Sequence, residues 1–113
     1  MGNFVPLLIL ALAALLEAGG DALVRAGLHA GSSIQKTGYL LGGAAVLFAY
    51  GLTVNTPSWD FGRLLGVYVT LFFVAAQAIN FLAFGVQPGL PIYVGGAFII
   101  AGGLLMTFWH PAG

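Results

Sequence analysis

The chain has 113 residues, of which 60% are hydrophobic and only 5% carry a formal charge. A water-soluble domain usually has charged side chains at about a quarter of its positions, so lipid must be the solvent for most of this surface. The formal net charge is zero, which argues against nucleic acid as a partner. The absence of cysteine excludes disulfides, thiol redox chemistry and thiolate-bound metal.

Four apolar segments approach or reach the length needed to cross a bilayer as helices. A helix rises about 1.5 Å per residue and the hydrocarbon core is about 30 Å thick, so a span needs roughly 20 residues. The connections are short and rich in turn residues, which predicts that successive helices are antiparallel neighbours and that both termini lie on one side. The predicted spans cover residues 4–28, 38–54, 64–84 and 90–109 of a single all-α transmembrane domain.

The side chains near the span ends carry little information about orientation. Amphipathic aromatic residues favour the membrane interface, and this predicts an anchoring role for Trp59 and Trp109, with His110 at the same depth. Lys36 lies at one face and Arg63 at the other, so the positive-inside rule has almost no bias to act on. We expect the chain to insert in both orientations.

The first predicted span contains three ionisable residues, Glu17, Asp21 and Arg25, at intervals of four. Each step of four advances about 40° around a helix, so the three form one leaning stripe. Counted from Phe4, Glu17 lies about 20 Å along the helix axis, inside the bilayer. A charge at that depth costs at least about 2.5 kcal/mol, which makes Glu17 a natural proton site. The alternative is a structural role for all three, in which Asp21 and Arg25 form an ion pair and Glu17 only faces a neighbouring helix.

Other polar groups occur within the second and third predicted spans. Gln77 and Asn80 lie on one face, where amides either join helices by hydrogen bonds or line a site. Tyr50 and Tyr68 offer hydroxyl groups and aromatic faces that can bind an organic cation, although ordinary packing is the alternative for each. The candidate proton- and substrate-binding residues are Glu17, Asp21, Tyr50, Tyr68, Gln77 and Asn80, with Arg25 as a charge partner.

The fourth predicted span is crowded with small residues and has no ionisable residue before His110. Small residues let helix backbones approach closely in lipid, so this span is predicted to mediate self-association through Gly95, Ala101 and Gly102. The glycine-rich stretches have no P-loop lysine, and the chain has no histidine pair at ligand spacing. We therefore expect neither an enzyme nor a bound metal or cofactor.

Two segments resemble the small multidrug resistance family of transporters. The first-span pattern is similar to the family's first helix, in which an essential Glu is followed by Gly and a basic residue: Glu17-x-x-Gly20-x-x-Leu23-x-Arg25. The last span resembles the family's fourth helix: Leu90-Pro91-x-x-x-Gly95-x-x-x-Ile99-x-Ala101-Gly102-x-Leu104. Tyr68 falls where the third helix of the family has an aromatic residue. The segment from Gly62-Arg63 through Tyr68 is also similar to a distant, YnfA-like branch of four-helix membrane proteins in the same superfamily.

The resemblance implies an antiparallel, dual-topology homodimer in a bacterial or archaeal inner membrane. In such a dimer the first three helices line a shared cavity, the fourth dimerises, and Glu17 exchanges protons for a small organic cation. Asp21 departs from the family, which usually has a small polar residue there. Two alternatives are a flippase subunit for a lipid-linked carrier and a non-transporting accessory subunit of a larger membrane complex. The pair Glu17 and Asp21 argues against the accessory subunit, because packing alone does not need it.

Overall fold

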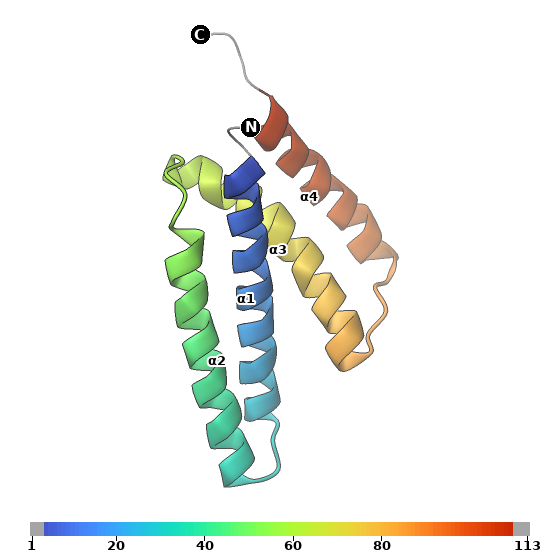
Figure 1. Cartoon of the computed structure of the whole chain (residues 1–113). Coiled ribbons are helices and arrows are strands. Elements are labelled where there is room, and N and C mark those ends of the chain that lie inside the picture. Colours follow the sequence, from blue (N-terminus) through green and yellow to red (C-terminus); the bar gives the residue numbers. More distant parts are fainter. Residues whose placement is uncertain (1–3, 110–113) are drawn as a thin grey trace.

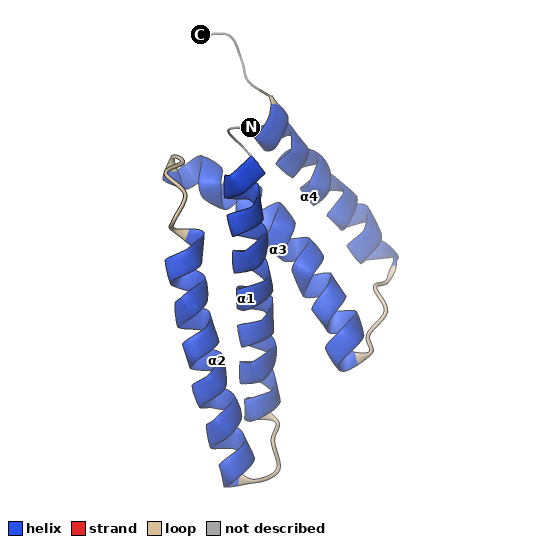
Figure 2. Cartoon of the chain, viewed as in Figure 1, coloured by secondary structure: helices blue, strands red, loops and turns tan. Residues whose placement is uncertain are grey.

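The computed structural model describes residues 4–109, and all four predicted spans are helices (Figures 1 and 2). The helices are α1 (Phe4–Leu28), α2 (Ser33–Val54), α3 (Phe61–Phe84) and α4 (Leu90–Phe108). Each is long and apolar enough to cross a membrane, which confirms the predicted all-α fold. The interfacial position predicted for His110 lies outside the described residues.

Two helices begin earlier than the apolar segments that predicted them. α2 begins at Ser33 rather than at residue 38, because the Ser32 hydroxyl accepts a hydrogen bond from the Gln35 amide at 3.1 Å. α3 begins at Phe61 rather than at residue 64, because an Asp60 carboxylate oxygen accepts from the Arg63 amide at 2.9 Å. These caps satisfy amide groups that a helix start leaves unpaired, so each helix extends into its polar connection.

α1 is the central helix of the arrangement. It packs against both α2 and α3, whereas α4 packs on α3 alone (Figure 1). The expectation that all successive helices are neighbours is therefore wrong for α2 and α3, whose backbones are separated by α1. Glycine allows the close contact of α1 with α2, since a Cβ at Gly43 would lie 2.7 Å from Val24 and 3.1 Å from the Gly20 carbonyl oxygen. The start of α1 and the end of α4 lie at the same end of the molecule, as predicted.

α4 packs on α3 through one face of its glycine-rich sequence. A Cβ at Gly96 would lie 2.7 Å from the Phe73 ring, and one at Gly103 would collide with the Thr70 side chain. The Thr70 hydroxyl donates a hydrogen bond across this contact to the carbonyl oxygen of Ile99 at 3.2 Å. In contrast, a Cβ at Gly95 or Gly102 would meet nothing within 4 Å. One glycine face is thus used inside the protomer, and the other is open.

Arg63 ties the beginning of α3 to the end of α4. Its Nε and Nη2 atoms donate to the carbonyl oxygens of Met106 and Thr107, each at 3.4 Å. Carbonyl groups in the last turn of a helix have no partner within the helix, so the guanidinium satisfies acceptors that would otherwise be unpaired. The cation also lies 4.1 Å from the centroid of the Trp59 ring. Trp59, predicted only as an interface anchor, is half-buried and packs against the core.

Candidate functional site

Glu17 of α1 and Tyr68 of α3 are joined by a direct hydrogen bond. The Tyr68 hydroxyl donates to Glu17 Oε1 at 2.6 Å and also lies 3.4 Å from the carbonyl oxygen of Ala13. The Tyr68 residue is only 4% exposed and Glu17 is half-buried, so this bond is partly shielded within the protomer. A short O–H···O bond of this length is typical of a charge-assisted donor–carboxylate pair. The predicted interior carboxylate therefore has a fixed donor from another helix.

Aromatic rings from two further positions surround this bond. The Tyr50 ring of α2 lies 5.7 Å from the Tyr68 ring, and the Phe72 ring of α3 lies 6.0 Å from it. These centroid distances are within the range of favourable aromatic pairs. Three helices thus contribute to one centre, which we call the Glu17–tyrosine centre and define as Glu17, Tyr50 and Tyr68.

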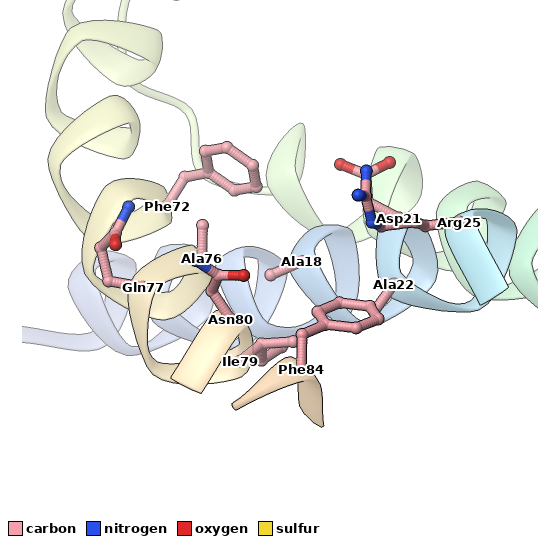
Figure 3. A pocket seen from close by; sticks show the side chains of 10 residues that line it. All are labelled: Ala18, Asp21, Ala22, Arg25, Phe72, Ala76, Gln77, Ile79, Asn80 and Phe84. Atoms are coloured by element: carbon pink, nitrogen blue, oxygen red, sulfur yellow. The ribbon is translucent and has the colours of Figure 1, made fainter. Parts of the chain in front are cut away.

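A cavity of about 240 Å³ between α1 and α3 contains the other predicted polar residues (Figure 3). α1 contributes Asp21 and Arg25, which are exposed, and α3 contributes Gln77 and Asn80, which are half-buried. We call this space the polar cavity. Its full lining is Ala18, Asp21, Ala22, Arg25, Phe72, Ala76, Gln77, Ile79, Asn80 and Phe84.

The Glu17–tyrosine centre and the polar cavity adjoin each other. The Phe72 ring packs against the Tyr68 ring, and Phe72 also lines the polar cavity. Ala18, which follows Glu17 on α1, also lines the cavity. The seven candidate residues therefore fall into two neighbouring groups, with Arg25 in the same group as Asp21. Neither grouping involves Gly95, Ala101 or Gly102, which lie on α4.

Sequence reasoning missed two aromatic residues of this region. Phe72 lies one helical turn after Tyr68, and Phe84 lies one turn after Asn80, so both share the polar face of α3. The Arg25 guanidinium carbon lies 5.7 Å from the centroid of the Phe84 ring, within the range of a cation–π contact. The signal that predicts both residues is their spacing of four from polar residues already singled out. Within residues 4–109, no cluster of three metal-binding side chains is found.

Replacing Tyr68 with phenylalanine should measure what the donor contributes. The ring would still pack against Tyr50 and Phe72, but Glu17 would lose its hydroxyl partner. We expect the free energy of unfolding to fall by about 1–3 kcal/mol, because a carboxyl group is left without its donor in the interior. Thermal unfolding of the purified protein in detergent would report the change. The control is Tyr39→Phe, which removes a hydroxyl group from an exposed side chain. Equal free energies of unfolding for the two variants would contradict the prediction.

The fold and the site together define a small integral membrane protein of four helices with a half-buried carboxylate on a membrane-spanning helix. The chain is 32% identical over 111 residues to a UPF0060 membrane protein of Herpetosiphon aurantiacus, and the alignment covers 96% of this chain and 98% of that relative. The chain therefore belongs to the UPF0060 family of membrane proteins. No known family profile and no solved structure matches it.

Proposed function

We propose that the protein is a proton-coupled antiporter that exports small organic cations across a bacterial or archaeal inner membrane. The observation that carries this proposal is the hydrogen bond between Tyr68 and Glu17 at 2.6 Å, inside a helix that is apolar enough to span the bilayer. Ionisable residues in such segments mark ion and substrate pathways. The resemblance of α1 and α4 to the small multidrug resistance transporters supports the same function.

The chemistry of exchange follows from the cost of an isolated charge. Glu17 in the interior is stable when it holds a proton or when a cation accompanies its carboxylate, and it is unstable with neither. Proton and cation therefore compete for one group, and each weakens the binding of the other by the same factor. The Tyr68 hydroxyl would orient the carboxylate, and the aromatic faces of Tyr50 and Tyr68 would contact the cation.

The open side of the polar cavity supports the further proposal of a homodimer. Asp21 and Arg25 are exposed on the protomer although they lie on a membrane-spanning helix. Contact of these groups with hydrocarbon would be costly. A second copy of the chain, with water enclosed between the two protomers, would shield them from the lipid. The open face of α4, with Gly95 and Gly102, offers a surface on which helices can approach closely.

A proton-release assay on the purified protein tests this function. Guanidinium and quaternary ammonium compounds, choline among them, are added in weak buffer and the pH is followed with an indicator dye. We expect release with the cations and none with 3,3-dimethylbutanol, an uncharged molecule of nearly the shape of choline. If no cation in the panel releases protons, a flippase subunit or an accessory subunit becomes the better account.

The balance of charges predicts dual topology. Lys36 lies near the connection of α1 and α2, and Arg63 lies near the opposite end of the bundle, so neither end dominates. We expect reporters fused to the C-terminus to be active on both sides of the membrane. Adding two or three lysines to the connection of α1 and α2 should shift the population to one orientation, whereas the same number of glutamines should not. A wild-type chain with a single orientation would contradict this prediction and favour a heteromeric partner.

A further inference from the structure

The two adjoining sites differ in formal charge. The Glu17–tyrosine centre contains one carboxyl group, whereas the polar cavity contains both Asp21 and Arg25. A simple cation that enters the polar cavity gains little, because Arg25 repels what Asp21 attracts. The ligand that matches such a cavity carries both signs of charge, or none.

The order of charges along α1 favours a ligand that carries both. Glu17 and Asp21 precede Arg25, so the acidic end of the stripe lies toward the Glu17–tyrosine centre and the basic end lies one turn beyond Asp21. One turn of four residues corresponds to about 6 Å of rise. A compact zwitterion whose two charges are separated by about this distance could place its cationic end near Asp21 and its anionic end near Arg25.

The contact of Arg25 with Phe84 suits this role. The guanidinium carbon lies 5.7 Å from the centroid of the Phe84 ring, within the range of a cation–π contact. The N–H groups of a guanidinium lie at its edge, in a fork that matches a carboxylate with two parallel hydrogen bonds. Phe84 would therefore position Arg25 at the end of the polar cavity without occupying the donors that an anion needs.

The size and the opposite wall of the cavity are consistent with a small polar guest. A space of about 240 Å³ is far larger than a single water molecule needs, so it has room for a small molecule. Gln77 and Asn80 add amide donors and acceptors from α3 to the lining of the cavity (Figure 3). The cavity thus has room for a small molecule and carries polar groups from both α1 and α3.

We propose that the polar cavity is a subsite for compact zwitterions, in which Arg25 binds the carboxylate of the ligand while its cationic group lies toward Asp21 and Glu17. This inference rests on the proposed function, because it names the class of cation that the transporter accepts: organic cations that also carry a carboxylate. Asp21 has two uses in this arrangement. It attracts the cationic end of the ligand, and it offsets the charge of Arg25 when the cavity is empty.

The test compares two probes that differ in one charge. 4-(Trimethylammonio)butanoate is a zwitterion, and its methyl ester is a monocation of nearly the same size and shape. Binding to the full-length protein in lipid nanodiscs is measured by calorimetry. We expect the zwitterion to bind at least tenfold more tightly than the ester, since only the carboxylate brings a negative charge to accept hydrogen bonds from the Arg25 guanidinium. This comparison needs no variant and so does not depend on a mutant protein that folds.

Two substitutions then assign the preference to Arg25. Arg25→Gln should remove the preference for the zwitterion and bind the ester at least as well, because a repelling cation is gone. Arg25→Lys keeps the charge without the fork and should retain part of the preference. Equal affinities of the two probes in the wild type, no binding of the zwitterion, or a preference that survives in Arg25→Gln would each overturn the inference. Failure of simple cations to release protons would instead overturn the antiporter function, and the preference for the zwitterion is measured independently of it.

Discussion

Replacing Glu17 with glutamine should abolish cation-driven proton release while leaving the protein folded. The amide has nearly the shape of the carboxyl group and can still accept the hydrogen bond that Tyr68 donates at 2.6 Å. The amide cannot release a proton, so a cation would have no proton to displace and no carboxylate to accompany. The expected result is no release in the dye assay and no proton-linked uptake of cation in proteoliposomes, with normal thermal stability and dimer yield.

Two other carboxylates separate a specific effect from a general one. Asp60 is the N-terminal cap of α3 and lies outside the site. Asparagine caps a helix about as well as aspartate, so Asp60→Asn should behave as the wild type does. Asp21→Asn should be milder than Glu17→Gln, because Asp21 lies in the polar cavity rather than at the hydrogen bond with Tyr68. If Glu17→Gln transports a cation at the wild-type rate with the same dependence on pH, Glu17 has a structural role and the antiporter function is wrong.

The location of Glu17 within a helix long and apolar enough to span a membrane was predictable from the sequence, but its hydrogen-bond partner was not. The apolar run before Glu17 is too short to cross a bilayer, so the membrane segment has to include it. Tyr68 is separated from Glu17 by 51 positions along the chain, and no local pattern joins them. The contact depends on α1 lying beside α3, which the fold determines through packing across the whole bundle.

The position of α1 also explains the errors in the predicted arrangement. Short connections alone imply a chain of successive neighbours, but they do not show which helix occupies the centre. The role of Arg63 was missed for a different reason: its acceptors at Met106 and Thr107 lie 43 and 44 positions away on α4, and no local pattern joins them. The early start of α2, in contrast, was available in the sequence: Ser32 followed three residues later by Gln35 is a capping pattern.

The glycines of α4 show a further limit of prediction from sequence. Their number predicts a helix that associates closely with others, but composition does not say whether the partner is inside the chain or outside it. The structure separates two faces. Gly96 and Gly103 contact α3, and Gly95 and Gly102 have open space around them. These two faces allow a direct test, since one substitution can be placed on each.

Gly102→Leu should weaken the dimer while leaving the protomer intact. A leucine at this position meets nothing within the protomer, so the packing of α4 on α3 is unaffected. On the open face it would hold the backbone of a second chain away, and close approach of backbones is what drives association of helices in lipid. We expect the dissociation constant of the dimer to rise by roughly tenfold, or about 1.4 kcal/mol. Crosslinking of purified protein over a range of detergent concentrations would measure it.

Gly103→Leu, at the neighbouring position, is the matched control. Its side chain would collide with Thr70, and overpacking of this kind costs about 1–3 kcal/mol, so the protomer itself should lose thermal stability. The two variants thus change two different measurements: dimer yield for Gly102→Leu, and unfolding temperature for Gly103→Leu. An unchanged dimer yield in Gly102→Leu would show that α4 is not the surface of self-association. In that case the exposed polar cavity between α1 and α3, rather than the glycine face, becomes the surface that a second copy has to cover.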